Sequence, residues 1–328
     1  MNNYILGEKM RLFLMITIAM LTFSNPSMAA GDFSVFMADL REDAARKGIS
    51  QDTIAKALHS DLKPIPRIIQ LDRKQPEKTI GFSEYYEKIV NASRINKGRQ
   101  NLSTYQSELA KASKKYGVPE NVIVALWGIE TNYGQNMGSF HVIDALVTLA
   151  YDGRRSSYFR KELINALQII DNKHISYDRM IGSWAGAMGH CQFMPSSFLS
   201  LAQDGNGDGR KDIWGTKEDV FASTAHYLAK NGWKESEPVL KEISLSGFNQ
   251  REVLNKRTYK SLDEWARLGI KNINGSVISG QERARLVEPR GSKGRAFLAF
   301  NNYDVILKWN NSSYFATSVG LLSKAISR

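Results

Sequence analysis

The chain has 328 residues, enough for one large domain or two to three small ones, and its single cysteine excludes an intramolecular disulfide. Its 44 basic and 33 acidic residues give a formal net charge of +11, which suits an anionic polymer or surface as partner. Nucleic acid is disfavoured, because no basic arm, zinc-finger spacing or aromatic RNA-binding motif accompanies this charge.

The first residues have the pattern of an export signal. Lys9 and Arg11 precede an apolar run over residues 12–23, and small residues up to Ala29 suit a cleavage site. The alternative is a retained membrane anchor, although the run is short for a membrane span. We expect a signal peptide over residues 1–29. The sole cysteine, Cys191, lies too deep in the chain to carry a lipid beside the cleavage site.

Most of the mature chain has helical patterns. Apolar spacing predicts helix from Phe33 to about residue 60 and again over residues 83–116, with an irregular, proline-punctuated connection between them. Pro119 suits the first turn of a helix that leads to Glu130. Further helices are expected at residues 156–170, 195–203 and 217–230.

The pattern changes after Trp233. Short segments separated by glycine, asparagine and serine predict the strands of a small antiparallel sheet, at residues 238–246, 283–288, 295–300 and 303–308. A helix is expected again at residues 314–326. The chain therefore reads as a helical body with a late β insertion.

Glu130 stands out because it is the only carboxylate in the almost wholly apolar segment 122–134. Ionising an acid in such a setting is costly, so we expect its pKa to be raised. A carboxylic acid still protonated near neutral pH can donate a proton to a leaving oxygen. The alternatives are a buried glutamate neutralised by lysine or arginine, or an exposed glutamate at a fraying helix end.

Residues 204–212 match the first nine positions of an EF-hand calcium loop, with glycine at position six. A hard divalent cation needs a cluster of oxygen ligands, and position seven contributes a backbone carbonyl. The oxygen donors would be Asp204, Asn206, Asp208, the Arg210 carbonyl and Asp212. Position twelve is Gly215 instead of glutamate, so Glu218 or Asp219 would supply the last carboxylate. We expect a structural role for calcium.

Two other interpretations of this loop stay open. Residues 216–219 resemble a helix capping box, in which Asp219 would reach back to the Thr216 amide. An aspartate- and glycine-rich loop can also be a plain polar turn.

Residues 183–197 form a second unusual window. Its small residues permit close backbone approach, and Ser183, Trp184 and Gln192 are suited to holding a sugar. A tightly packed helix–loop explains the same pattern equally well. His190 beside Cys191 suggests a thiol nucleophile, but adjacent side chains rarely point at each other. No histidine has zinc-ligand spacing and no phosphate-binding motif occurs, so we expect no organic cofactor.

Together these windows resemble the lytic murein transglycosylase B family, whose members cleave the glycan strands of peptidoglycan. The resemblance covers nearly all of the mature chain, from Phe33 through the C-terminal helix. The matching pieces, in chain order, are residues 71–76, 127–134, 183–197, the calcium-type loop and Trp309-Asn310 with Tyr314.

The resemblance implies a mainly α (α+β) fold. Its parts would be a lysozyme-like core with an EF-hand-type loop, a helical N-terminal domain and a small antiparallel β domain. We place the helical domain at residues 30–112, the core at 113–236 with its calcium loop at 204–219, the β domain at 237–300, and a C-terminal segment returning to the core at 301–328.

The resemblance also implies roles for individual residues, with Glu130 as the catalytic acid and base. Lining the saccharide groove would be Ser183, Gln192, Tyr227, Asn310 and Tyr314. The metal ligands would be Asp204, Asn206, Asp208, the Arg210 carbonyl and Asp219, with Glu218 close behind. Two departures are His190, where the family often has glutamine or tyrosine, and the missing lipid-anchor cysteine. The second departure favours a soluble periplasmic form.

Glycosidases usually employ two carboxylates, but only Asp144 and Asp152 follow Glu130 closely, and neither shares its apolar setting. The resemblance implies a lytic reaction, in which the C6 hydroxyl of N-acetylmuramic acid replaces water and a 1,6-anhydro end forms. The alternatives are a hydrolytic muramidase of lysozyme type and a non-catalytic peptidoglycan-binding protein. We expect a monomer that binds peptidoglycan glycan strands, with cell-wall synthesis or remodelling proteins as possible partners.

Overall fold

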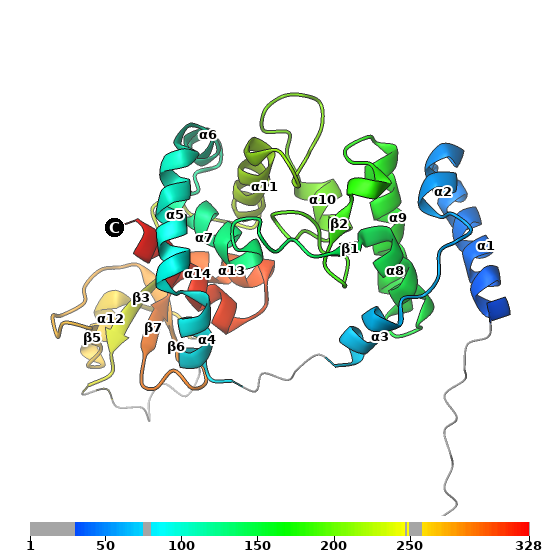
Figure 1. Cartoon of the computed structure of the whole chain (residues 1–328). Helices are drawn as coiled ribbons and strands as arrows, with labels where there is room; N and C mark the ends of the chain where they lie inside the picture. Colours follow the sequence, from blue (N-terminus) through cyan, green and yellow to red (C-terminus); the bar gives the residue numbers. More distant parts are fainter. Residues whose placement is uncertain (1–29, 75–79, 247, 249–257, 328) are drawn as a thin grey trace, which may run out of the picture.

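The computed structural model describes residues 30–74, 80–246, 248 and 258–327 (Figure 1). The predicted signal peptide over residues 1–29 therefore lies outside the described residues. No helix within the described ranges is both long and apolar enough to cross a membrane.

The first two helices form one end of the molecule, and the third lies further in, against α8, residues Val142–Tyr151 (Figure 1). Two helices, α1 (Ala30–Arg46) and α2 (Gln51–Ala57), replace the single helix expected from residue 33 to about 60. The chain turns between them at Gly48, whose φ of 83° is open to glycine without steric cost. Ser50 then caps α2 by accepting the Thr53 amide. The third helix, α3 (Pro66–Arg73), begins at a proline in the expected irregular stretch.

The helical pattern over residues 83–116 is also divided. It contains α4 (Phe82–Ile89), α5 (Ala92–Thr104) and α6 (Gln106–Tyr116). These helices pack against α7 (Glu120–Thr131), α11 (Lys217–Lys230) and α14 (Ser313–Ile326). Pro119 is the N-cap residue of α7, one position before the first turn in which we expected it.

The middle of the chain builds a helical hairpin and the loops around it. Helices α8 (Val142–Tyr151) and α9 (Ser156–Asp171) pack on each other, and α2 and α3 cover their outer side. Strands β1 (Phe140–His141) and β2 (Ile181–Gly182) pair antiparallel. The helices expected at 156–170, 195–203 and 217–230 are confirmed as α9, α10 (Pro195–Leu201) and α11. Helix α8 was not predicted. Asp144 is its only charged residue, and a short apolar run of this kind can be a strand or a helix.

The late β insertion is confirmed as an antiparallel sheet with strand order β4-β6-β7-β3-β5. Its strands are β3 (Leu240–Ser244), β4 (Lys260–Ser261), β5 (Lys271–Asn272), β6 (Arg283–Val287) and β7 (Ala296–Ala299). A short helix, α12 (Leu262–Arg267), begins with a capping box between Ser261 and Glu264. The sheet and α12 share a separate apolar core centred on the fully buried Trp265.

The strand predicted at residues 303–308 is wrong, because these residues belong to helix α13 (Asn301–Trp309). The buried residues recur with helical spacing, at 302, 303, 305 and 306, in a segment too short to show its period. Asn302 anchors the start of α13 by donating to the carbonyls of Lys234 and Glu237 and accepting the Lys234 amide. This tertiary contact is invisible in the local pattern.

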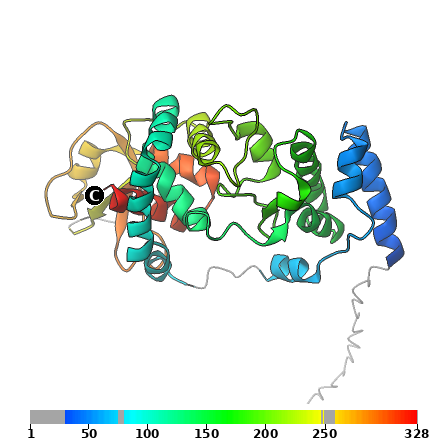
Figure 2. The ribbon, with the colours of Figure 1, turned by 45° about the horizontal axis from the view of Figure 1, so that its top comes forward.

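The C-terminal helix predicted at 314–326 is confirmed as α14, which packs against α7 in the main core. Figure 2 shows α1 and α2 (blue) at one end of an elongated molecule and the β sheet region at the other. Two apolar cores, one large and one confined to the β region, underlie this shape. The boundaries that we assign to the domains stay predictions.

Replacing Glu162 with alanine should loosen the joint between α9 and α10. The Glu162 carboxylate is 4% exposed and accepts the backbone N–H and the hydroxyl of Ser196 at 2.8 and 2.7 Å. We expect the free energy of unfolding to fall by about 1–3 kcal/mol, because two partly buried donors of Ser196 lose their partner, a buried carboxylate. Glu42, whose exposed carboxylate pairs with Arg46, is the control, and its change to alanine should cost less than about 0.5 kcal/mol. If denaturant titrations show equal losses in free energy of unfolding for the two variants, Glu162 does not stabilise the joint between α9 and α10.

Candidate active site

Glu130 lies in the last turn of α7, after seven consecutive buried residues from Val122 to Gly128. Glu130 as a whole is partly exposed, but burial of its carboxyl group raises the pKa of that group to about 7. Among the described residues, no lysine or arginine forms an ion pair with it. The alternative of a neutralised buried glutamate is therefore not supported, and the acid stands ready to be protonated near neutral pH.

The indole of Trp309 is the hydrogen-bond partner of this carboxyl. Its Nε1–H donates to Oε1 of Glu130 at 2.7 Å, and this bond lowers the pKa of Glu130 against the larger effect of burial. Trp309 ends helix α13, and its ring packs on Tyr227 and Phe193 with centroid distances of 4.6 and 5.2 Å. In the sequence Trp309 is part of a family motif, but it is not among the predicted site residues.

Helix α7 ends in an unusual backbone conformation directly after the acid. Asn132, Tyr133 and Gly134 have φ values of 50°, 60° and 87°, all in the left-handed region that non-glycine residues avoid. The surrounding structure holds this turn, since the Tyr133 hydroxyl donates to the Arg94 carbonyl and the Gly134 amide to the Thr131 hydroxyl. The strained turn thus fixes the end of the helix that carries Glu130.

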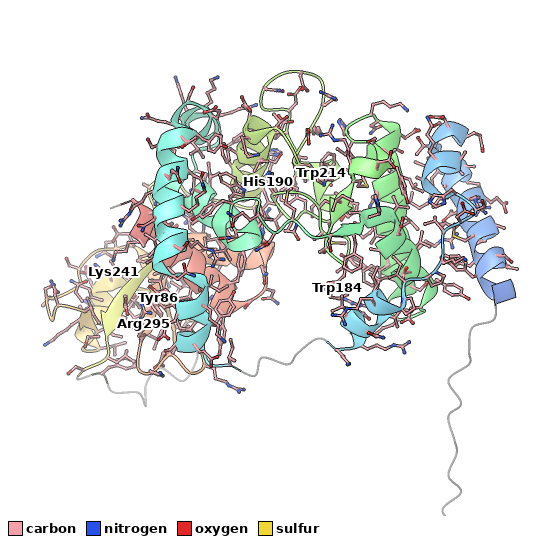
Figure 3. All side chains as sticks on the ribbon, in the orientation of Figure 1. Tyr86, Trp184, His190, Trp214, Lys241 and Arg295 are labelled. Carbon is pink, nitrogen blue, oxygen red and sulfur yellow. The ribbon has the colours of Figure 1, made fainter. Side chains whose placement is uncertain are left out.

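Gly134 also makes room for His190. A Cβ at Gly134 would lie 2.0 Å from Cε1 of His190, which no side chain can tolerate. Nδ1 of His190 accepts the Trp127 Nε1–H at 2.8 Å, and its Nε2 lies 3.0 Å from Nζ of Lys217. Burial, followed by the Lys217 charge, lowers the pKa of His190 to about 4, so the ring is neutral. Figure 3 shows this residue in the interior, near Trp214.

These contacts decide two questions that the sequence raised. The His190 side chain, 5% exposed, faces α7 and ties the loop before α10 to the helix of Glu130. Cys191 is not a nucleophile, because burial raises the pKa of its thiol to about 12 and its sulfur faces Thr224 and the Val220 carbonyl.

Ser183 and Gln192 shape the loops beside α7. The Ser183 hydroxyl accepts the amides of Ala185 and Ala187. Gln192, at a φ of 49°, donates from Nε2 to the carbonyls of Met137 and Gly189. It therefore joins the loop after Glu130 to residues 183–197. Trp184 lies away from His190, towards α3 (Figure 3).

The remaining predicted groove residues are Tyr227, Asn310 and Tyr314. The Tyr227 hydroxyl donates to the Lys308 carbonyl, and Asn310 follows Trp309 as an exposed C-cap residue. Tyr314 is buried, donates to the Arg290 carbonyl and packs on Tyr85. The pKa of Tyr85 is raised by burial and then by the Glu130 charge. Tyr85 therefore lies near the acid, and nothing in its helical sequence context marks it.

No second carboxylate accompanies Glu130 in the described part of the chain. Asp144 accepts the Tyr177 hydroxyl at 2.8 Å, and Asp152 pairs with Arg73 at the same distance. A cavity of about 780 Å³ lies instead where α13 begins, lined by charged residues such as Lys234, Arg283 and Asp304, and none of the predicted site residues lines it. The described site thus offers one acid for proton transfer.

The calcium-type loop folds around its own oxygen atoms. Asp204 accepts the amides of Gly207, Asp208 and Gly209, and the Asp208 carboxylate accepts the Arg210 amide. No three His, Cys, Asp or Glu side chains of the described chain are grouped as a metal site would require. The donors present are nevertheless all oxygen, the chemistry that a hard cation prefers.

Asp219 closes this loop from the first turn of α11. Its carboxylate is fully buried and accepts the Gly205 amide at 2.7 Å and the Asp212 amide at 2.6 Å. The capping-box alternative is therefore wrong, since the carboxylate joins the two ends of the loop and Thr216 makes no side-chain cap. Burial raises the pKa of Asp219 to about 6, with a contribution from the Asp204 charge. Asp208 and Asp212 pair with Arg210 and Arg179 at 3.5 Å, whereas the carboxylates of Asp204 and Asp219 form no ion pair among the described residues, and these two fit a cation.

Comparisons with known proteins identify relatives of the chain. The family model described as "Transglycosylase SLT domain" matches residues 32–324. Over 244 residues the chain is 30% identical to the membrane-bound lytic murein transglycosylase B of Escherichia coli (strain K12). That alignment covers 74% of this chain and 66% of the relative, so the chain spans slightly less than two thirds of the relative's length.

Solved structures are similar over most of the chain. SltB3 from Pseudomonas aeruginosa, in complex with NAG-anhNAM-pentapeptide, has a TM-score of 0.86 and 37% identity, covering 90% of this chain and 79% of its own. The Escherichia coli lytic transglycosylase Slt35, in complex with calcium, has a TM-score of 0.76 and 27% identity, covering 89% and 92%.

Replacing Glu130 with glutamine should stabilise the folded protein at alkaline pH. Folding raises the carboxyl pKa from 4.5 to about 7, so the wild type loses stability as the pH rises through this range. Glutamine carries no charge, and its carbonyl can still accept the Trp309 bond. We expect the variant to gain about 1–3 kcal/mol in free energy of unfolding at pH 8 and little at pH 4. Denaturant titrations at both values test this, and a difference independent of pH would refute it.

Proposed function

The chain belongs to the transglycosylase SLT domain family, the lytic transglycosylases that cleave glycosidic bonds of peptidoglycan, and we propose that Glu130 is its acid and base. The observation that carries the proposal is a single acid of raised pKa, bonded to an indole and without a second carboxylate in contact. An acid with a pKa near the working pH can both give and take a proton.

The proposed reaction follows from having one acid. Protonated Glu130 gives its proton to the oxygen that joins N-acetylmuramic acid to N-acetylglucosamine, and the bond from C1 to that oxygen breaks. The N-acetyl oxygen of the substrate stabilises the positive centre at C1, as in substrate-assisted glycosidases. Ionised Glu130 then takes the proton of the C6 hydroxyl, whose oxygen bonds to C1. The 1,6-anhydro product forms without water, and the anhydro ligand named in the SltB3 complex supports this outcome.

We propose that the five predicted groove residues hold the glycan in two ways. Ser183 and Asn310 keep solvent exposure and would contact the saccharide directly. Gln192 is also partly exposed, and because its Nε2 already donates to two carbonyls, it would contact the saccharide through Oε1. The hydroxyls of Tyr227 and Tyr314 already donate to backbone carbonyls, so these rings would form the walls of the groove. This division predicts that removing either tyrosine hydroxyl alone affects binding less than removing the amide of Asn310.

Digestion of purified peptidoglycan tests the reaction. Mass spectrometry should find muropeptides lighter by one water than hydrolytic products, because the C6 hydroxyl replaces water as the nucleophile. Glu130→Gln should reduce turnover by at least about 1,000-fold, since the sole proton donor is lost. Asp144→Asn is the matched control and should retain turnover, because this carboxylate is bonded to Tyr177.

Two outcomes would replace the proposal. Products that carry the added water would identify a hydrolytic muramidase. Binding of peptidoglycan without any cleavage would identify a binding protein, in which Glu130 merely contacts sugar.

We also propose that Ca²⁺ binds the loop and has a structural role. Asp204, Asn206, Asp208, the Arg210 carbonyl and Asp219 would hold it, and the cation would neutralise carboxylates that now accept backbone amides. The calcium complex named for Slt35 supports the choice of cation. No step of the reaction uses this site.

Calcium should raise the melting temperature of the wild type and chelation should lower it, since a ligand of the folded state stabilises that state. Asp204→Ala should abolish the response, whereas Asp61→Ala, a change at an exposed acid elsewhere, should preserve it. If neither calcium nor chelator changes the melting temperature, the proposed calcium site is excluded.

For location, we propose export to the periplasm, where the substrate lies, on the pattern of residues 1–29. As partners we propose peptidoglycan glycan strands, with cell-wall synthesis or remodelling proteins as further candidates, and a monomeric chain.

A further inference from the structure

The contact between Trp309 and Glu130 is asymmetric. Only Oε1 of the carboxyl receives the indole N–H, at 2.7 Å. An indole nitrogen is a donor and never an acceptor. Oε1 therefore accepts in both protonation states of Glu130. Because a carbonyl oxygen is a stronger acceptor than a hydroxyl oxygen, this bond favours the acid proton on the other oxygen, Oε2.

We propose that Trp309 is a positioning residue that assigns both proton transfers to Oε2 of Glu130. The inference rests on the proposed role of Glu130 and adds which atom acts and what selects it. Oε2 would give its proton to the leaving oxygen and then remove the proton of the C6 hydroxyl. The leaving oxygen and the C6 hydroxyl must therefore each come within hydrogen-bond distance of Oε2, one after the other. This requirement restricts the sugar conformations that can react.

The indole can hold this assignment because it is fixed on several sides. Tyr227 and Phe193 pack on its ring. The end of α13 is tied to α11, since the Tyr227 hydroxyl donates to the Lys308 carbonyl and Nζ of Lys308 donates to the Asn231 carbonyl. A rotation of the indole away from Glu130 would have to break this packing.

The same bond sets the balance between the two roles of the acid. An N–H donor stabilises the ionised carboxylate more than the neutral acid, because the bond to an anion is stronger. Burial acts in the opposite direction and is the larger effect. Without the indole donor, Glu130 would hold its proton more tightly and serve poorly as the base of the second step.

The sharpest test replaces the indole N–H without changing the ring. Incorporating 3-benzothienylalanine at position 309 exchanges the N–H for sulfur, and Trp309→Phe removes the donor with a smaller ring. In ¹³C NMR titrations of the Glu130 carboxyl, both changes should raise its pKa by about one unit. The alkaline limb of the pH–kcat/KM profile should move up by the same amount, and kcat should fall about tenfold with little change in KM.

Trp184→Phe is the matched control, because it removes an indole that lies away from His190 and has no bond to Glu130. The carboxyl titration should stay at the wild-type value. An unchanged titration in the benzothienyl protein would overturn the inference even if activity falls. The NMR titration needs no turnover, so it separates this inference from the proposed function. Full activity of Glu130→Gln would contradict the proposed function. The effect of the indole on the Glu130 carboxyl would still be decided by the NMR titration of the wild type and the benzothienyl protein.

Discussion

Burial of one carboxylic acid at the end of an apolar helix is the constraint on which the site depends. Seven consecutive residues of α7 shortly before Glu130, from Val122 to Gly128, are buried, so the acid is held where its charge is poorly solvated. No lysine or arginine of the described chain forms an ion pair with this acid. Its partner is the indole N–H of Trp309, a neutral donor that orients the carboxyl group and leaves its pKa near neutrality. An arginine in the place of Trp309 would keep the acid ionised and remove its capacity to donate.

This arrangement requires segments that are distant in sequence to meet at one helix. Helix α5 supplies Arg94, whose carbonyl holds Tyr133, and the loop before α10 supplies His190, which bonds Trp127. Helix α13 returns after the β sheet to supply Trp309. Lys217, beside His190, lies in the first turn of the helix that also carries Asp219. The calcium-type loop and the helix of Glu130 are thus joined through a short series of buried contacts.

The structure around the acid is strained as well as buried. Three successive left-handed residues follow α7, and Gly134 must lack a side chain to admit His190. An ionisable group in a poorly solvated position and a strained turn both reduce stability, and the large apolar core offsets them. Such local costs are typical of sites in which geometry is held for chemistry.

The sequence by itself determined the features whose signals are local. The helices α9, α10, α11 and α14, three strands of the sheet, the apolar setting of Glu130 and the oxygen-rich loop all follow from the spacing of residues close together in the chain. Only the tertiary structure decided that residues 303–308 form a helix, because Asn302 is anchored by Lys234 and Glu237. It alone placed Trp309 on Glu130, 179 residues away, and excluded the capping-box alternative for Asp219, whose carboxylate accepts the Gly205 and Asp212 amides. Local patterns report backbone preference and burial, whereas the partner of a buried polar group is selected by packing between distant segments.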